Sequence, residues 1–378
     1  MSVNTRSATF VYGDQLAGYD LGPQHPLKPV RLRMVYELLQ AYGVFGNKAG
    51  LVEAAPATDQ DILQAHDADY VEMVRRLSRG EDVPSARDYG FGYGDNPAFP
   101  GMYEASLLYT GASLTAARQV VSGESRVSFS ISGGLHHALR NRASGFCIFN
   151  DPVVAIHELL HKLGRVAYID IDAHHGDGVQ YAFEDRSDVL TISIHESGDS
   201  LFPGTGFAED IGSGPGAGYS VNLPVAAYTD DATWFRVLQE IVPPLMESYS
   251  PDVIVAQLGA DGHFGDPLTH LNLTTDGWLQ AVKLILGLGK PVVALGGGGY
   301  NLSSVTRMWT LAYAAMLGTD LPDQIPASFA DKYGIRRLRD AVRPEVSMSD
   351  QRRASEMAEA TIATIRRAVF PVHGLCVE

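Results

Sequence analysis

Short runs of β-branched and other apolar residues recur along this chain, and segments with apolar residues at helical spacing lie between many of them. Strands that alternate with helices are typical of βαβ units, in which helices cover both faces of a parallel sheet. The pattern therefore predicts an α/β fold, a three-layer α/β/α sandwich with a mostly parallel central sheet. A closed β/α barrel is the alternative, because about eight strands could also close. The predicted strands span 9–12, 127–131, 166–169, 189–194, 219–223, 253–258 and 292–295, and the predicted helices span 30–42, 107–121, 153–162, 232–249 and 277–288.

The chain shows no internal repeat and no shift in composition that would mark a domain boundary. We therefore expect a single domain over all 378 residues, with a core at about 8–320. Residues 327–378 are expected to form a C-terminal helical extension. Apolar residues at helical spacing predict a helix over 350–367 within it, capped by Ser349 or Asp350.

Composition and charge exclude several classes of function. The net charge is −15 and there is no basic tract, which argues against nucleic-acid binding. The longest apolar run, 284–299, is interrupted by glycines, a lysine and a proline, so no membrane span is expected. Residues 1–10 lack the apolar segment of a signal peptide. Two cysteines, Cys147 and Cys376, cannot build a disulfide framework, so the chain is expected to be cytoplasmic.

Clusters of polar residues and glycines follow the ends of several predicted strands. In an open parallel sheet the carboxyl ends of the strands lie at one edge, and ligands bind there. The clusters are therefore expected to meet at a single site. They are Gly-Gly-Leu-His-His at 133–137, Asp-Ile-Asp-Ala-His-His-Gly-Asp-Gly at 170–178, Gly-Ala-Asp-Gly-His at 259–263 and Gly-Gly-Gly-Gly-Tyr-Asn at 296–301.

Asp172 and His174 alternate along the chain, so their side chains can point to one side of an extended backbone. Together with Asp261 they offer two carboxylates and one imidazole. This set suits one divalent metal ion, Zn²⁺ or Fe²⁺, with a coordination position left for water, and it does not distinguish the two metals. Such a metal can polarise a carbonyl and lower the pKa of water.

His136 and His137 are adjacent and follow glycines that permit the bent backbone both would need to face one site. Asp170 and Asp177 are the carboxylates expected to set their tautomers. The hydroxyl of Tyr300 could donate a hydrogen bond to an oxyanion. With the metal, these residues predict metal-assisted amide hydrolysis. Cys147 lies among apolar residues and is expected to be buried rather than nucleophilic.

These motifs resemble those of a known family. Gly-Gly-Leu-His-His-Ala, Ser-Gly-Phe-Cys, Asp-x-Asp-x-His-His-Gly-Asp-Gly, Phe-Pro-Gly-Thr-Gly, Leu-Gly-Ala-Asp and Gly-Gly-Gly-Gly-Tyr occur in this order over about four fifths of the chain. The chain is identified as a member of the histone deacetylase family, with its arginase/deacetylase fold, and it is similar to the bacterial acetoin-utilisation branch. The resemblance implies a zinc-type enzyme that hydrolyses the acetyl amide of N6-acetyl-lysine in proteins and releases acetate. It favours His137 as the general base.

The resemblance also assigns roles in substrate binding. Phe146, next to Gly145, and Phe202 would form the walls of a narrow tunnel around the acetyl-lysine stem. Asp95 would match a rim aspartate that binds the substrate backbone. Arg31 would line an internal channel for acetate release, although a surface charge on the first helix is the alternative.

Leu268 follows Gly-Asp-Pro, where polyamine deacetylases of the family place an acidic gate. An apolar residue there favours acetyl-lysine in a protein, with acetylpolyamines or another small acetyl amide as the alternative substrates. A binuclear arginase-like hydrolase and a non-catalytic acetyl-lysine reader are further alternatives. An acyl-CoA synthetase is the partner implied by the bacterial branch, and the oligomeric state stays open.

The resemblance finally implies structural monovalent cations, K⁺ or Na⁺, bound largely by backbone carbonyls. One site would be formed by Asp170, Asp172, His174, Ser193 and Ile194, and a second would lie near Phe183, Arg186, Val189 and Tyr219.

Overall fold

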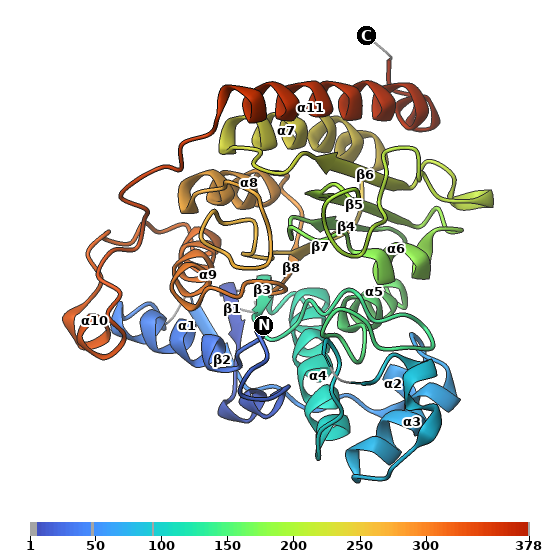
Figure 1. Cartoon of the computed structure of the whole chain (residues 1–378), viewed down its shortest axis with the longest axis vertical. Coiled ribbons are helices and arrows are strands. Elements are labelled where there is room, and N and C mark those ends of the chain that lie inside the picture. Colours follow the sequence, from blue (N-terminus) through green and yellow to red (C-terminus); the bar gives the residue numbers. More distant parts are fainter. Residues whose placement is uncertain (1–5, 47–48, 93, 377–378) are drawn as a thin grey trace.

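A computed structural model describes residues 6–46, 49–92 and 94–376 and contains one eight-stranded sheet. The strand order is β2-β1-β3-β8-β7-β4-β5-β6, and every neighbouring pair is parallel (Figure 1). The strands are β1 (Arg6–Val11), β2 (Ala49–Val52), β3 (Ser125–Ser130), β4 (Val166–Asp170), β5 (Val189–Glu196), β6 (Ser220–Val225), β7 (Val253–Gln257) and β8 (Val292–Leu295).

Helices form a layer on each face of the sheet. Neighbouring contacts link α1, α9, α8, α7 and α11 into one layer, and link α3, α4, α5 and α6 into the other (Figure 1). The α-helices are α1 (Val30–Ala41), α2 (Asp59–Ile62), α3 (Ala68–Ser78), α4 (Met102–Val121), α5 (Asp151–Leu160), α6 (Asp177–Phe183), α7 (Asp231–Tyr249), α8 (Thr275–Gly287), α9 (Leu302–Met316), α10 (Ala327–Tyr333) and α11 (Met348–Ala368). Short 3₁₀ helices are η1 (Asp14–Gly18), η2 (Pro84–Tyr89), η3 (Gly214–Gly216) and η4 (Phe370–His373).

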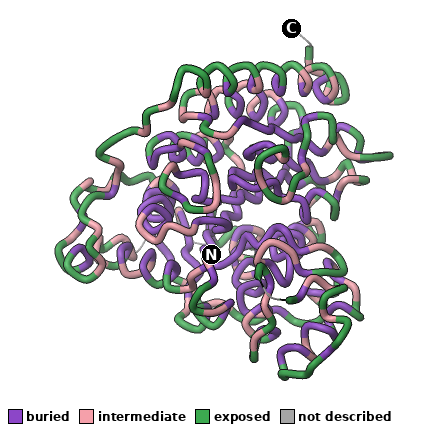
Figure 2. The backbone as a smooth tube through the Cα atoms, viewed as in Figure 1, coloured by how far each residue is buried: buried purple, intermediate pink, exposed green. Residues whose placement is uncertain are grey.

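The core lies on both faces of the sheet, and buried residues concentrate at the central strands (Figure 2). All residues of β4, β5, β7 and β8 are buried, as expected for parallel strands covered on both sides. The predicted three-layer α/β/α sandwich is confirmed. The alternative of a closed barrel is wrong, because β2 and β6 lie at opposite edges of the sheet and do not pair.

Several elements were not predicted. Strand β2 has only four residues, Ala-Gly-Leu-Val, and pairs at the sheet edge with an exposed Leu51, so it lacks the pattern of a buried strand. Helix α9 is buried on nearly every side, which removes the polar face that marks an amphipathic helix. Helix α3 does carry apolar residues at helical spacing, so its pattern is visible in the sequence.

The C-terminal helix begins earlier than predicted. Helix α11 starts at Met348, and the Oγ atom of Ser347 accepts a hydrogen bond from the backbone N–H of Asp350 at 3.1 Å. The predicted caps Ser349 and Asp350 are therefore wrong, since both lie inside the first turn. The helix packs on α7 and β6.

The sheet order places the predicted polar clusters next to one another. Strands β3, β8, β7 and β4 are consecutive neighbours in the sheet, and each of them precedes one cluster. All are parallel, so their carboxyl ends lie at one edge. The expected convergence of the four segments is confirmed.

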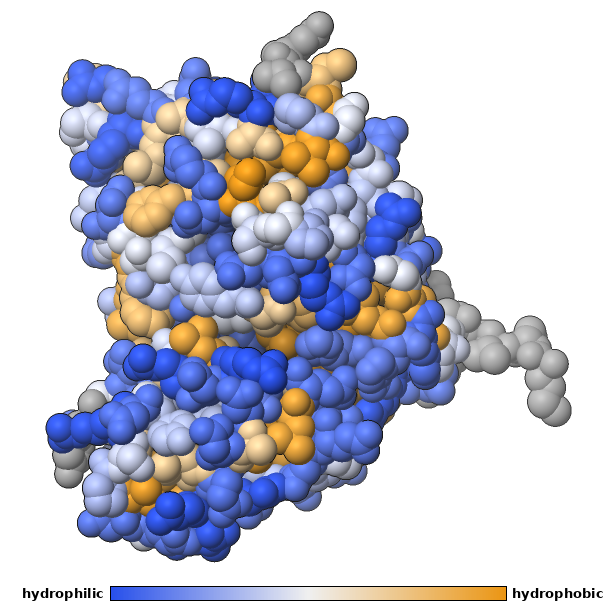
Figure 3. All heavy atoms as spheres, turned by 90° about the vertical axis from the view of Figure 1, so that its right-hand side faces the viewer, coloured by the Kyte–Doolittle hydropathy of each residue, from blue (hydrophilic) through white to orange (hydrophobic). Residues whose placement is uncertain are grey.

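The face of the molecule seen in Figure 3 is largely polar. Hydrophilic residues cover most of the face seen in Figure 3, and apolar residues form limited patches on it. Among the described helices, none is both long and apolar enough to cross a membrane. The prediction about residues 1–10 falls partly outside the described residues, as do the last two residues of the C-terminal extension.

Asp340 joins the C-terminal segment to the sheet end. Its largely buried carboxylate accepts hydrogen bonds from Arg307 at 2.8 Å, His263 at 3.1 Å and the Thr275 backbone N–H at 2.7 Å. Burial raises the pKa of Asp340, but these donors outweigh burial and hold that pKa well below its ordinary value. A depressed pKa in the folded state stabilises the fold above the unfolded pKa, near 4.

We expect Asp340→Ala to lower the free energy of unfolding by about 3 kcal/mol at neutral pH, because it leaves buried donors unpaired. The difference from the wild type is expected to shrink as the pH falls below about 4, where the unfolded-state carboxyl is already protonated. Urea unfolding at several pH values measures both effects. The exposed Asp331→Ala on α10 is the control, and an equal loss in the control contradicts the assignment.

Candidate active site

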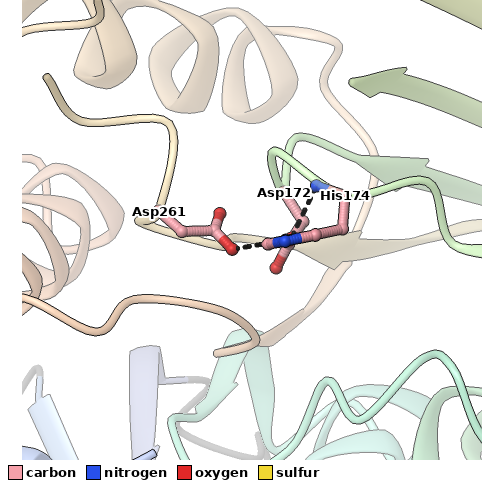
Figure 4. Close-up of side chains that lie close together, drawn as sticks. All are labelled: Asp172, His174 and Asp261. Carbon is pink, nitrogen blue, oxygen red and sulfur yellow. Dashed lines mark hydrogen bonds and ion pairs between the residues drawn. The ribbon is translucent and has the colours of Figure 1, made fainter. Parts of the chain in front are cut away.

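Three side chains come together where β4 and β7 end. Asp172 and His174 lie in the loop after β4, Asp261 lies in the loop after β7, and their ligand atoms are all within 4.8 Å of one another (Figure 4). His174 Nδ1 lies 2.9 Å from Asp261 Oδ2 and 3.2 Å from Asp172 Oδ1. All three residues are buried. Two carboxylates and an imidazole turned toward one point could hold a metal ion.

Electrostatics also fit a cation at this point. Burial and the charge of Asp172 raise the pKa of Asp261. At Asp172, His136 and His174 outweigh the effect of burial and lower the pKa. Buried carboxylates this close need compensating positive charge. Among the described residues, no second cluster of three or more His, Cys, Asp or Glu is placed to hold another metal. This supports a mononuclear site over the arginase-like alternative.

Backbone groups fix the two carboxylates. Asp172 Oδ2 accepts from the Gly298 N–H at 2.7 Å, and Asp261 Oδ1 accepts from the Ala173 N–H at 2.9 Å. A Cβ atom on Gly298 would lie 2.0 Å from Asp261 Oδ2. The glycine run after β8 is thus required for close approach of the backbone, rather than for a flexible turn.

The two histidines lie beside the Asp–His–Asp group. His136 Nδ1 is 2.8 Å from Asp170 Oδ2, His137 Nδ1 is 2.7 Å from Asp177 Oδ1, and the two Nε2 atoms are 3.0 Å apart. The predicted carboxylate partners are therefore placed as expected. His136 Nε2 is also 3.9 Å from Asp172 Oδ1.

The environments of the two histidines differ. Burial lowers the pKa of His136, but Asp170 and Asp172 outweigh burial and raise it to about 9. Burial and the neighbouring His136 lower the pKa of His137 to about 4. This pattern matches an imidazolium at His136 that donates to a neutral His137. A metal cation beside Asp172 would oppose the positive charge on His136.

Tyr300 follows the glycine run and lies beside His174. Its ring centroid lies 6.5 Å from that of His174 and 5.6 Å from that of Phe146. Burial, with the charges of Asp261 and Asp172, raises the pKa of Tyr300 well above its ordinary value. The hydroxyl therefore stays protonated and can donate a hydrogen bond.

Two carboxylates that position these residues were missed in the sequence. Buried Asp266 accepts a hydrogen bond from the backbone N–H of Tyr300 at 2.8 Å. Buried Asp151 accepts from the N–H groups of Gly134 and Leu135 at 2.8 Å each, and these two bonds fix the turn before the histidines. Asp266 belongs to the Gly-Asp-Pro stretch, but its acceptor role depends on contacts that a sequence does not display. Asp151 precedes a proline at the start of α5, a sequence pattern that indicates the beginning of a helix rather than a catalytic site.

Two aromatic rings flank the approach to these residues. The Phe202 ring lies 5.0 Å from that of His137, and the partly buried Phe146 ring lies 4.4 Å from that of His25. Gly145 precedes Phe146 and packs closely on two other side chains, since a Cβ atom there would lie 2.5 Å from His137 and 2.9 Å from Phe202. The structure thus places Phe202 and Gly145 beside His137, and Phe146 beside Tyr300, while the roles of these residues in a tunnel stay predictions.

Asp95 lies further out. It is exposed, and its backbone carbonyl accepts from His25 Nε2 at 3.2 Å. Asp95 lines a surface groove of about 520 Å³ together with Gly145 and Phe202. Leu268 is partly buried, and its N–H donates to Asp266 at 3.0 Å. The roles of Asp95 and Leu268 stay predictions.

Arg31 is buried, so the alternative of a surface charge is wrong. Its guanidinium donates to the Gly299 carbonyl at 3.0 Å and lies 5.0 Å from the Trp309 ring centroid. Its role in an acetate channel stays a prediction. Cys147 is buried as expected, and burial raises its pKa well above the ordinary value, which excludes a reactive thiolate.

The predicted monovalent cation sites stay predictions. At the first predicted site, Asp170 on β4 lies opposite Ser193 on β5. This pairing brings the β4 residues of the site next to Ser193 and the following Ile194. At the second predicted site, the Arg186 N–H donates to the Phe183 carbonyl at 3.0 Å. The Tyr219 carbonyl accepts from the Thr191 N–H at 2.9 Å, near Val189 at the start of β5.

Comparison with known proteins identifies the family. The histone deacetylase domain matches residues 25–316. The chain is 39% identical over 336 residues to the acetoin utilization protein AcuC of Bacillus subtilis, covering 87% of each chain. It is 38% identical over 323 residues to histone deacetylase RPD3 of Saccharomyces cerevisiae, covering 84% of this chain and 74% of that protein.

Solved structures agree with this result. The crystal structure of a histone deacetylase homologue from Aquifex aeolicus gives a TM-score of 0.85 at 31% identity, and the match covers 94% of this chain and 99% of the other. The arginase/deacetylase-like fold expected from the motifs is thus confirmed, and the metal-dependent deacetylase chemistry of that fold is supported by the buried Asp–His–Asp group. This chain belongs to the histone deacetylase family.

Proposed function

We propose that this protein hydrolyses the acetyl amide of N6-acetyl-lysine in proteins and releases acetate, using one divalent metal ion, Zn²⁺ or Fe²⁺, held by Asp172, His174 and Asp261. The observation that carries the proposal is the placement of these three residues beside His137, Tyr300 and the paired walls Phe146 and Phe202. Complete ligand and catalytic sets argue against a non-catalytic reader.

The walls suit the substrate. Two aromatic faces can pack against the apolar methylene stem of a lysine side chain, while the catalytic residues lie at the inner end. When bound, the metal polarises the acetyl carbonyl and lowers the pKa of water.

His137, whose lowered pKa keeps it neutral, accepts a proton as water attacks the acetyl carbon. The Tyr300 hydroxyl donates a hydrogen bond to the carbonyl oxygen as that oxygen becomes negative. The C–N bond then breaks, and the histidine pair returns a proton to the lysine nitrogen. Asp170 and Asp177 hold both rings in the required tautomers.

Two residues, the apolar Leu268 and the exposed Asp95, support acetyl-lysine in a protein over a polyamine as the proposed substrate. Leu268 supplies no carboxylate for a distant amine of a polyamine, whereas Asp95 at the tunnel mouth can accept hydrogen bonds from a peptide backbone. A cytoplasmic acetylated protein, with an acyl-CoA synthetase as one candidate, is the proposed partner.

Metal reloading tests the proposal. We expect the metal-free protein to be inactive and the protein reloaded with Zn²⁺ or Fe²⁺ to release acetate faster from an acetyl-lysine peptide than from acetylputrescine. Asp261→Asn, which weakens the ligand set, is expected to need more metal for the same rate. Turnover of acetylputrescine alone contradicts the protein substrate, and full activity without metal contradicts the mechanism.

We expect Tyr300→Phe to keep the fold and bound metal but to lower kcat about 100- to 1000-fold, since loss of one oxyanion donor costs about 2.7–4 kcal/mol. Acetate release and metal content of the purified variant measure the two effects. Tyr42→Phe removes a surface hydroxyl bonded to the Pro322 carbonyl and is the control. Near-normal turnover by Tyr300→Phe excludes the oxyanion role.

We expect Asp95→Ala to reduce kcat/KM on acetyl-lysine peptides about 10-fold or more, because a charged hydrogen bond is worth about 1.5–3 kcal/mol. The loss on acetylputrescine is expected to be smaller, since that substrate has no peptide backbone. Steady-state kinetics on both substrates give the ratio. The control is the exposed Asp82→Ala. Equal losses on the two substrates rule out backbone recognition.

A further inference from the structure

A surface groove of about 520 Å³ includes Gly145 and Phe202 among its lining residues. It therefore lies beside the tunnel proposed above, to which these two residues are assigned. Its other walls come from Arg87, from residues 90–92 and 94–96, and from residues 142–144. A substrate chain that emerges from the tunnel beside Phe202 therefore meets this groove with the residues that flank its acetyl-lysine.

The groove is positively charged although the protein is acidic. Its charged lining residues within the described part of the chain are Arg87, Arg142 and Asp95, whereas the whole chain has a net charge of −15. Both arginines are exposed. Neither makes an ion pair or a side-chain hydrogen bond with any described residue, unlike the nearby Arg140, which pairs with Asp67 at 2.7 Å.

The backbone carrying the arginines is held in place. The Ala143 N–H donates to the Tyr89 carbonyl at 2.9 Å, which joins the segment of Arg142 to that of Arg87. Gly90, at a φ of 83°, packs so closely on this contact that a Cβ atom would lie 2.0 Å from the Ala143 carbonyl oxygen. The two guanidinium groups therefore emerge from a fixed platform, with their planar donors free for a carboxylate.

We propose that Arg87 and Arg142 select substrates with acidic side chains next to the acetyl-lysine, an inference that rests on the proposed function. A carboxylate from a flanking Asp or Glu pairs with the guanidinium groups, while Asp95 binds the substrate backbone between them and the tunnel. A cationic polyamine gains nothing from this groove and is repelled by it, which agrees with a protein substrate.

Peptides with both termini blocked test the proposal, because only their side chains then carry charge. One peptide has Glu on both sides of the acetyl-lysine and the other has Gln. We expect the wild type to prefer the Glu peptide about 10-fold in kcat/KM, since each of two exposed ion pairs contributes a modest stabilisation. Arg87→Gln and Arg142→Gln are each expected to reduce this preference about threefold, and the double variant to abolish it.

Arg126→Gln is the matched control. It makes the same change in net charge near the amino end of β3, away from the carboxyl ends of the strands where the site lies, and is expected to keep the preference. Raising the ionic strength from about 0.05 M to about 0.5 M is expected to weaken the wild-type preference, because screening acts on exposed charges. Binding of both peptides to Tyr300→Phe provides a readout that is independent of turnover.

The outcomes separate the two proposals. Equal kcat/KM for both peptides, or a Glu preference that survives in the double variant, overturns the role of the arginines and leaves the deacetylase function intact. Hydrolysis of neither peptide by the metal-loaded wild type overturns the proposed function and this inference with it.

Discussion

The structure depends on burying two carboxylates of one site within a few ångströms of each other. Asp172 and Asp261 both lie beside His174, in an interior where unpaired charge is costly. Their oxygens are therefore used as acceptors for the backbone. The N–H groups of Gly298 and Ala173 turn toward them, and these bonds join the loops that follow β8, β4 and β7. The charge that suits the site to a metal also holds its loops together.

The sheet order explains why distant segments can share this charge. Strands β3, β8, β7 and β4 are neighbours, although residues 125 and 292 are far apart in the sequence. Strands β4, β7 and β8 are buried along their whole length, and β3 is buried except at Arg126 near its start, so charged side chains lie near the strand ends. A parallel sheet covered on both faces therefore concentrates polar chemistry at its carboxyl edge.

This logic sets what the sequence can predict. The polar clusters are visible because each interrupts an apolar run, and the fold class follows from alternating patterns. The choice between an open sheet and a barrel depends on whether β2 and β6 pair, and no local pattern records that contact. Strand β2 escaped prediction because an edge strand of four residues has little apolar burial to display.

Residues that act through the backbone are hidden for the same reason. Asp266 accepts from the N–H of Tyr300, and Asp151 accepts from the turn before His136, but neither has the spacing of a ligand. Their role follows from distances between segments. A catalytic side chain can be recognised from its residue type, whereas a positioning side chain can be recognised only from the groups that it contacts in the fold.

Substrate discrimination must come from outside the catalytic centre. An acetyl amide presents the same carbonyl and nitrogen whether it belongs to a polyamine or a protein, so His137 and Tyr300 meet the same reacting atoms in both. A difference in kcat/KM requires contacts that only one substrate makes in the transition state. In the proposed binding mode, the walls Phe146 and Phe202 contact only the stem, which both substrates possess. The charged residues at the mouth meet what differs, a backbone with side chains in one case and a cationic amine in the other. In an acidic protein, a cationic groove at that position favours a protein substrate over a cationic polyamine.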